Sequence, residues 1–260
     1  MSVWSPSQVN KYLECPVKWT LGRQGVPEVR DKWSPGLIVG TAVHAALAEH
    51  YRGERSHGKD EALEEIVRAE VLVAWPQEEV GWEQEAVVAR ALGMLHRVLD
   101  RTPEVLADGG EVVAVEEALG PGEREDGTYP GTADLITKHD GGRYLVVTDW
   151  KTHWSLDDPW VEKELSETER NFQLHQYAWF ARQKYGLPVA FVRKVVARCL
   201  PGPKAWVHAV PLDPRRLETW YKGAEVVWAQ MTAGVVFPNW QSCRKYGKCG
   251  YYHECFQEGR

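Results

Sequence analysis

The residues best suited by type and spacing to do chemistry lie in the segment VVTDWKTH, residues 146–153. A strand-like apolar run ends there in a carboxylate, Asp149, followed two residues later by an ammonium group, Lys151. Because residues i and i+2 of a β-strand point to the same face, the two side chains are expected to share one side of a sheet. An isolated pair of this kind is most often a surface ion pair. A second carboxylate beside it would instead indicate a metal site.

The preceding strand-like segment, GTADLITKH, supplies that second carboxylate in Asp134. A two-residue turn at 140–141 would put Asp134 diagonal to Asp149, one at 141–142 would put the two directly opposite, and a three-residue loop would separate them. Two neighbouring carboxylates repel each other unless a cation lies between them, and oxygen ligands favour Mg²⁺ or Mn²⁺. Such an ion together with the lysine is suited to phosphodiester hydrolysis.

The rest of the chain predicts the elements that position these residues. Helical periodicity is found at 4–21, 37–53, 61–74, 83–100, 166–186 and 214–233. Runs of β-branched residues bounded by turn residues are found at 111–120, 131–139, 142–152, 189–200 and 205–210. This order predicts an α/β (α+β) fold with a mixed sheet flanked by helices, a helical N-terminal third and a cysteine-rich C-terminal tail.

Composition limits the classes of protein that fit. The chain has 260 residues, of which 43% are hydrophobic and 26% charged, enough for a sizeable core. It has no apolar run of membrane-spanning length and no signal-peptide pattern, so we expect a cytoplasmic protein that does not bind membranes. The net charge of −6 argues against a uniformly basic surface. Residues 171–212, however, contain no acid and six Lys or Arg, which leaves room for a local basic surface.

Cysteines form a second group of chemically capable residues. The count of five is odd, which disfavours a disulfide framework. Cys243, Cys249 and Cys255 lie close together in the tail, and Cys15 can add a fourth thiolate from the other end of the chain. Four thiolates suit a [4Fe-4S] cluster or a structural zinc, with His253 in place of one cysteine as a variant of the zinc site. Simple buried thiols are the third alternative.

The motifs around the aspartates, the lysine and the cysteines resemble those of a known protein family. Asp134 followed by the DWK motif at 149–151 resembles the signature of the PD-(D/E)XK nuclease superfamily. The segment GTAVHAAL, with His44, and the segment QLHQYAWF, with Gln173 and Tyr177, resemble further motifs of its RecB-type branch. That branch includes the AddB nuclease domain and the CRISPR-associated exonucleases. The start SPSQVNKYLECP and the terminal cysteine triplet are also similar to it.

The resemblance implies a role for each residue and a restriction-endonuclease-like fold in a single nuclease domain over 1–260. It implies metal ligation by His44, Asp134, Asp149 and the Trp150 carbonyl. It implies that Lys151 acts in catalysis beside the two aspartates, that Gln173 and Tyr177 orient the lysine or the DNA backbone, and that either Glu116 or Glu117 is a supporting acid. It favours the [4Fe-4S] cluster, which would join residues 1–20 to residues 240–260.

These implications predict a metal-dependent DNA nuclease, an exonuclease acting on duplex ends or single strands. The alternative is a non-catalytic, cluster-stapled adaptor that binds nucleic acid. An idle site has no chemical reason to keep His44, Asp134, Asp149 and Lys151 together, so the full set favours the enzyme. The resemblance also implies a helicase, a CRISPR protein or a phage recombination protein as partner, and leaves that choice open.

Overall fold

The computed structural model of the protein describes residues 3–28, 35–53, 59–75, 83–120, 131–244 and 249–256. The chain divides into two compact units. The sheet unit comprises residues 34–119 and 132–217, and the terminal unit comprises residues 1–33, 120–131 and 218–260. The carboxylates and the lysine lie in the sheet unit, and four of the five cysteines lie in the terminal unit.

A five-stranded sheet with the order β1-β2-β3-β4-β5 is the centre of the sheet unit. Its strands are β1 (Glu111–Leu119), β2 (Gly131–His139), β3 (Tyr144–Ser155), β4 (Val189–Leu200) and β5 (Lys204–Pro211). Strands β3 and β4 run parallel, whereas β2 and β3, and likewise β4 and β5, run antiparallel. The prediction of a mixed sheet is therefore confirmed.

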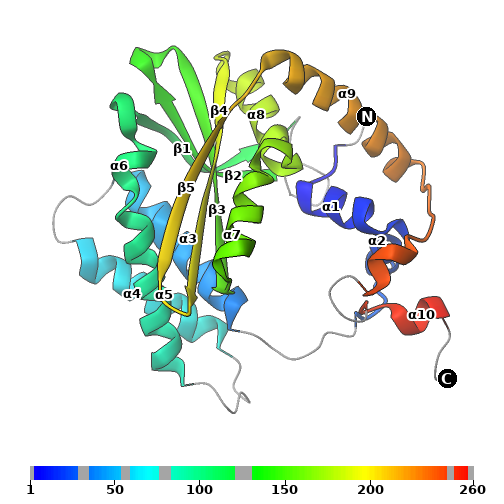
Figure 1. The fold of residues 1–260 in the computed structure, drawn as a ribbon, viewed down its shortest axis with the longest axis horizontal. Coiled ribbons are helices and arrows are strands. Elements are labelled where there is room, and N and C mark those ends of the chain that lie inside the picture. The colour runs from blue at the N-terminus through cyan, green and yellow to red at the C-terminus, as the bar shows by residue number, and fades with distance from the viewer. Residues whose placement is uncertain are drawn as a thin grey trace. The chain divides into compact units, whose positions relative to one another are not determined.

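Helices cover both faces of this sheet. They are α3 (Gly36–Arg52), α4 (Lys59–Ala74), α5 (Gln84–Leu99), α6 (Thr102–Val105), α7 (Asp158–Ser166) and α8 (Phe172–Tyr185), with 3₁₀ turns η1 (Ala107–Gly109), η2 (Asp140–Gly142) and η3 (Thr168–Arg170). Helices α3 and α5 pack on one face, and α7 and α8 on the other (Figure 1). Helix α7 was not predicted from the sequence, because its periodic apolar pattern rests on few residues, with Val161 as its one buried side chain.

Helix α3 shows why these sequences form these elements. Val39, Val43 and Leu47 recur at helical spacing and are fully buried against the core. The helix ends where Gly53 adopts a left-handed conformation, with φ of 74°, because glycine enters that region without a steric penalty. The opposite side of α3, which carries His44, faces a cleft.

Strand β4 limits how far residues 171–212 can form a basic surface. Three of the six cations of that window, Arg193, Lys194 and Arg198, are buried within the sheet unit. Arg193 donates a hydrogen bond of 2.6 Å to the Val105 carbonyl, at the C-terminus of α6. Such buried cations are compensated by carbonyl or carboxylate partners, so they fix neighbouring elements to the sheet and cannot meet a polyanion in solvent.

The terminal unit is built from α1 (Pro6–Glu14), α2 (Pro16–Arg23), most of α9 (Pro214–Thr232), η4 (Trp240–Arg244) and α10 (Tyr252–Phe256). Residues 4–21 were predicted as one helix, but Cys15 adopts an extended conformation and divides it. Pro16 is the cause, because proline lacks an N–H and disfavours helix in the residue before it. Ser5 occupies the N-cap position of α1 as expected, but its side chain makes no capping hydrogen bond.

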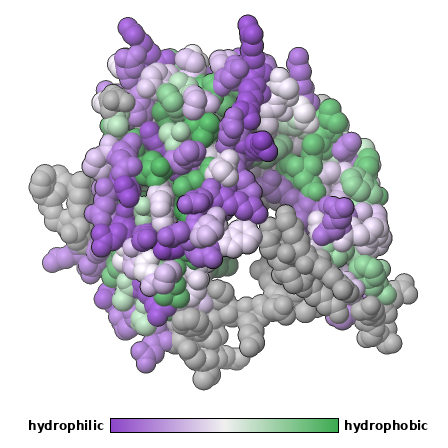
Figure 2. Space-filling view, in the orientation of Figure 1, coloured by the Kyte–Doolittle hydropathy of each residue, from purple (hydrophilic) through white to green (hydrophobic). Residues whose placement is uncertain are grey.

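Contacts from the N-terminal helices hold the end of α9 within the terminal unit. The Tyr12 hydroxyl donates a 2.8 Å hydrogen bond to the Val235 carbonyl, and the Trp4 indole donates one of 3.2 Å to Thr232. Exposed hydrophobic side chains occur on α9 and on the segment after it, among them Val226 and Phe237. Hydrophobic surface is visible at the right of Figure 2. Among the described residues, no helix combines the length and the apolar character that crossing a membrane requires.

Candidate active site

Strand β3 carries the first carboxylate and the lysine on one face, as the alternation of a strand requires. Asp149 is fully buried, while the Lys151 side chain remains 31% exposed. The Lys151 ammonium donates a hydrogen bond of 2.9 Å to Oδ1 of Asp149 and lies 2.9 Å from Oδ2. Within the described part of the chain, Oδ2 has no aligned hydrogen-bond donor, although it is buried. A buried carboxylate oxygen in that state is a candidate metal ligand.

Strand β2 brings Asp134 beside this pair. Leu135 pairs with Thr148 in the antiparallel register, so the next step along the ladder places Asp134 opposite Asp149. The connection is a four-residue turn, 140–143, closed by the Arg143 N–H on the His139 carbonyl at 3.0 Å. With this turn Asp134 lies directly opposite Asp149, as a two-residue turn at 141–142 would also place it, and not diagonal to it.

The two aspartates are strongly coupled. Burial raises the pKa of Asp134 well above its usual value, and the negative charge of Asp149 raises it further, against a 2.6 Å hydrogen bond from the Trp150 N–H. Burial likewise raises the pKa of Asp149, while the nearby Lys151 ammonium opposes the shift. Two buried carboxylates that disfavour each other's charge provide an environment that a divalent cation would stabilise.

Helix α3 positions His44 over these carboxylates. Its Nδ1 lies 3.8 Å from Oδ1 of Asp134, and its ring meets the Trp150 ring edge-on at a centroid distance of 5.8 Å. Burial, and to a smaller degree the Lys151 charge, lower the pKa of His44 to about 4, against the opposing effect of a hydrogen bond to the Trp150 backbone. The imidazole is therefore neutral at pH 7, the state that ligates metals.

Glycine allows α3 to approach the strand this closely. A Cβ added at Gly40 would lie 2.9 Å from the Thr152 hydroxyl oxygen, closer than Cβ contacts normally are. Gly40 is one turn before His44 on the same side of the helix. The absence of a side chain at this position therefore helps to set the height of the imidazole above β3.

Strand β1 contains both candidate glutamates, and only Glu116 lies close to His44 and Asp134. Ligand atoms of Glu116, His44 and Asp134 all lie within 4.8 Å of one another. Glu117 instead forms an ion pair with Lys184 of α8. Glu116 has φ of 52°, in the left-handed region, which costs a non-glycine residue on the order of 1–3 kcal/mol. Residue type and spacing do not distinguish the two glutamates, which are adjacent and identical.

Helix α8 supplies the residues that hold the lysine. The Gln173 side-chain oxygen accepts a 3.1 Å hydrogen bond from the Lys151 ammonium, and its amide donates one of 3.0 Å to the Tyr177 hydroxyl. Tyr177 is buried, and burial raises its pKa, so it remains a neutral phenol. Asn171 fixes the start of α8 by accepting a 3.0 Å hydrogen bond from the Leu174 N–H. Gln173 and Tyr177 thus share one helical face directed at Lys151.

A pair that the sequence did not single out lies on the other side of Asp149. Lys194 of β4 is in parallel register with Asp149 and is 2% exposed. Its ammonium donates 3.2 Å hydrogen bonds to the carbonyl and the carboxylate of Glu164, near the end of α7. Charged residues inside a mainly apolar strand were the available signal, but the burial of Lys194 depends on α7 covering the sheet.

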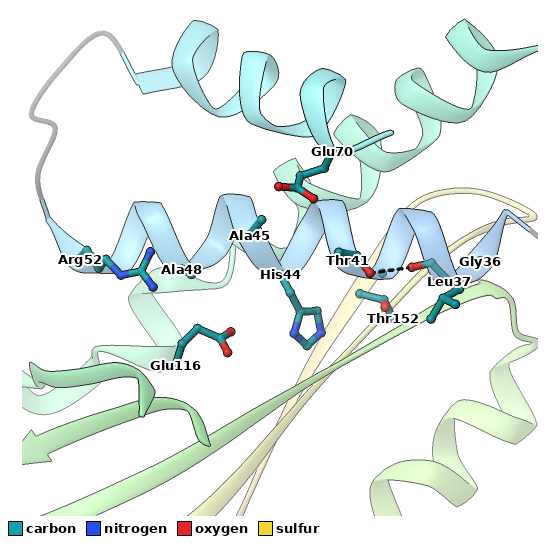
Figure 3. A pocket seen from close by; sticks show the side chains of 11 residues that line it. Gly36, Leu37, Thr41, His44, Ala45, Ala48, Arg52, Glu70, Glu116 and Thr152 are labelled. Carbon is teal, nitrogen blue, oxygen red and sulfur yellow. Dashed lines mark hydrogen bonds between the residues drawn. The ribbon is translucent and has the colours of Figure 1, made fainter. Parts of the chain in front are cut away.

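His44 and Glu116 open into a cleft of about 840 Å³ in the sheet unit (Figure 3). One wall is the exposed side of α3, from Gly36 to Arg52, and Glu70, Glu116 and Thr152 come from neighbouring elements. The site is therefore accessible to a large ligand. The two aspartates are buried and do not line the cleft, whereas His44 and Glu116 do.

The donor set fits a hard divalent cation. A neutral imidazole and the carboxylates of Glu116 on β1 and Asp134 on β2 have ligand atoms within 4.8 Å of one another. Asp149 on β3 lies opposite Asp134 outside that group, and the Trp150 backbone is hydrogen-bonded to His44. Mg²⁺ and Mn²⁺ favour oxygen ligands, and imidazole suits Mn²⁺ better than Mg²⁺. The residues that would hold the ion are His44, Glu116, Asp134, Asp149 and the Trp150 carbonyl.

The terminal unit brings four cysteines to one small pocket. Cys15, Cys243, Cys249 and Cys255 all line it, together with Ser242 and Tyr251. Burial raises the pKa of the Cys255 thiol, and the charges of the other three thiols raise it further, which reflects their proximity. The Glu14 carbonyl accepts hydrogen bonds from Asn239 at 2.9 Å and Ser242 at 2.8 Å, which hold η4 beside α1.

This donor set suits a thiolate-ligated metal. Four sulfur ligands fit either an iron-sulfur cluster or zinc, and their number alone does not choose between them. Cys199 belongs to the sheet unit, where its thiol is buried and donates to the Arg90 carbonyl at 3.6 Å. It takes no part in the pocket, as expected for a packed thiol.

The family model for the PD-(D/E)XK nuclease superfamily matches residues 3–256. The chain therefore belongs to the PD-(D/E)XK nuclease superfamily, whose nucleases use divalent metals. A crystal structure named "Putative exonuclease" from Eubacterium rectale has a similar fold, with a TM-score of 0.56 and 14% identity, over 99% of this chain and 88% of that one. None of the curated proteins compared with the chain matches it. The fold is thus the restriction-endonuclease-like α+β fold that the sequence predicted.

Proposed function

We propose that this nuclease is a metal-dependent deoxyribonuclease that hydrolyses phosphodiester bonds at DNA ends, with single strands as its preferred substrate. The observation that carries the proposal is the convergence of His44, Glu116 and Asp134 around one point, beside the Asp149–Lys151 pair. The "Putative exonuclease" name of the Eubacterium rectale structure supports action at ends.

Each residue has a defined part in this reaction. When bound, Mg²⁺ or Mn²⁺ supplies Lewis-acid stabilisation of the scissile phosphate and lowers the pKa of a water nucleophile. Lys151 places a fixed positive charge where negative charge develops on the phosphate, and its contact with Asp149 holds its direction. Gln173, fixed by Tyr177, holds the ammonium from the other side. The neutral His44 keeps a lone pair for the ion.

We further propose that the four cysteines of the terminal unit hold a [4Fe-4S] cluster, with zinc as the alternative. The shared pocket and the mutual influence of the thiols support a metal there. In this proposal the cluster joins residues 1–20 to residues 240–260 of the terminal unit, and residues 1–260 form a single nuclease domain. The cytoplasmic location and a helicase, phage or CRISPR partner stay predictions.

The decisive experiment incubates the purified protein with end-labelled linear DNA or closed circular DNA in Mg²⁺, Mn²⁺ or excess EDTA. We expect cleavage of linear DNA in both metals, at least as fast in Mn²⁺ as in Mg²⁺ because of the imidazole ligand, and none in EDTA. Lys151→Met should lower kcat on the order of 10³-fold, since it removes a charge that acts in the transition state.

Lys138→Met is the matched control, because Lys138 lies on β2 in a surface ion pair with Glu111. It should cleave like the wild type. Equal activity in EDTA would contradict the metal mechanism. If Lys151→Met kept its activity in metal, the lysine would have no role in the reaction. Metal and DNA binding without any cleavage would favour the non-catalytic adaptor.

A further inference from the structure

The cleft contains an arginine for which the reaction described so far has no use. Arg52 occupies the last turn of α3 and lines the same cleft as His44 and Glu116. Its guanidinium points from α3 towards Glu116 (Figure 3). Among the described residues that line the cleft, Arg52 alone carries a permanent positive charge, since His44 is neutral and the charged remainder, Glu70 and Glu116, are acids.

The guanidinium is available to a ligand. The Arg52 side chain is 44% exposed, and its ion pair with Glu49 is long, at 3.9 Å. Its charge lowers the pKa of Glu116, against the larger effect of burial, so the two groups are close enough to interact. A guanidinium has five N–H donors in a planar fork that matches two phosphate oxygens. One long ion pair does not use that capacity.

The position of Arg52 selects which phosphate it can reach. Residues 44, 48 and 52 lie on one face of α3, and eight residues of helix span roughly 12 Å. Glu116, whose ligand atom lies within 4.8 Å of those of His44 and Asp134, lies between the His44 ring and the Arg52 guanidinium in Figure 3. The guanidinium therefore faces the part of the cleft beyond Glu116, where the next phosphate along a bound strand would lie, rather than the phosphate at the metal. Gly53 ends the helix directly afterwards, so the arginine lies at one end of the α3 wall.

We propose that Arg52 binds a non-scissile phosphate of the substrate strand, at a defined number of nucleotides from the cleavage site. This inference rests on the proposed nuclease function and deepens it. The phosphate contact makes the cleft select a polyanionic strand over an isolated phosphodiester, and it fixes the register in which the strand lies across the metal ligands. Arg52 is on this account a substrate-binding residue that leaves the chemical step to the groups around Lys151.

A methylphosphonate scan tests the contact. A short single-stranded oligonucleotide is prepared as a series in which one phosphate at a time is replaced by a neutral methylphosphonate. Cleavage in Mn²⁺ and binding in Ca²⁺ are measured for the wild type, Arg52→Gln and the control Arg97→Gln. Arg97 is a suitable control because it is an exposed arginine of α5, paired with Asp100 at 3.0 Å, that does not line the cleft.

We expect one non-scissile position at which the neutral group weakens binding and kcat/KM by about 10- to 100-fold in the wild type and in Arg97→Gln, the range of a hydrogen bond to a charged group. Arg52→Gln should show that loss already with unmodified DNA. At the sensitive position it should lose less than about 3-fold more, because the two changes remove the same interaction. Its penalties at all other positions should equal those of the wild type.

An unchanged profile in Arg52→Gln, with the full penalty still present at every position, would overturn the proposal. Arg52 would then serve only to balance the charge of Glu116. The same scan separates this failure from failure of the proposed function. A protein that binds the series with the Arg52-dependent pattern but never cleaves retains the phosphate contact and loses the nuclease assignment.

Discussion

The carboxylate site of the sheet unit and the four-cysteine site of the terminal unit are held together in different ways. In the first, Asp134 and Asp149 lie on adjacent hydrogen-bonded strands joined by a four-residue turn. In the second, Cys15 must meet cysteines more than 220 positions later in the sequence, at 243, 249 and 255. The first arrangement follows from the sheet alone. The second closes a very long loop, whose entropy a bound metal would help to offset.

The two sites also share a property, because each gathers groups that disfavour one another's charge. Burial and Asp149 raise the pKa of Asp134 in the first site. Burial and three neighbouring thiols raise the pKa of Cys255 in the second. Both sets would gain stability from a bound cation. The difference is that loss of the ion should cost the sheet unit its activity and the terminal unit its structure.

Of the variants considered, Cys15→Ser should have the largest effect, because it acts on the site that is expected to hold the terminal unit together. It removes one of four ligands from the terminal unit, so we expect the metal to be lost and Tm to fall by roughly 5–10 °C, since each kcal/mol shifts Tm by about 2–4 °C in a chain of this size. Iron and zinc content, the visible absorption of anaerobically prepared protein and thermal melting measure the effect.

Cys199→Ser is the matched control, because Cys199 is a buried thiol of the sheet unit that lies outside the cysteine pocket. It should keep the full metal content, and any change in Tm should come without a change in colour. If Cys15→Ser retained both its metal and its Tm, the four-cysteine site would have no structural role. Zinc without iron would keep the site and exclude the cluster.

The carboxylate site should have a smaller effect on stability, visible as a pH dependence of the free energy of unfolding of the metal-free protein. A carboxyl group whose pKa is raised in the folded state contributes stability below its unfolded pKa, near 3.9 for aspartate, and loses it as pH rises through the folded value. Burial raises the pKa of both Asp134 and Asp149. The metal-free wild type should therefore lose stability from about pH 4 towards neutral pH. Added Mn²⁺ should restore it at neutral pH.

Urea unfolding at a series of pH values checks this sign. Asp134→Asn removes the coupled charge, so its metal-free stability should depend less on pH, and Mn²⁺ should stabilise it less. Asp140→Asn is the control, since Asp140 is an exposed turn residue paired with Arg143 at 3.2 Å. If the free energy of unfolding of the metal-free wild type rose from pH 5 to pH 7 relative to that of Asp134→Asn, the raised pKa values of the two buried aspartates would be contradicted.

Much of the sheet unit could be predicted because its signals are local. The alternation in β2 and β3 and the two-residue spacing of Asp149 and Lys151 place these side chains on one face without any tertiary information. The sequence left three connections possible, two two-residue turns and a three-residue loop, because a glycine-rich turn allows more than one geometry. The four-residue turn at 140–143 settles the register through the hydrogen bond that closes at Arg143.

The remaining parts of the site depend on packing between distant elements. Glu116 and Glu117 are neighbours of the same type, and only the left-handed backbone at Glu116 and the ion pair of Glu117 with Lys184 separate them. Lys194 is explained by α7 covering it, and Arg52 by the cleft that α3 forms with β1. A single sequence contains no local pattern for such contacts.

The most direct test of the account is Mn²⁺ binding by calorimetry to the wild type, Glu116→Gln and Glu117→Gln. The two glutamates are adjacent and chemically identical, but only Glu116 has a ligand atom within 4.8 Å of those of His44 and Asp134. We expect Glu116→Gln to weaken Mn²⁺ binding by about 10- to 100-fold, with a parallel loss of DNA cleavage, and Glu117→Gln to stay within about 2-fold of the wild type. Equal Mn²⁺ affinity in all three proteins, or loss in Glu117→Gln alone, would contradict the proposed metal site.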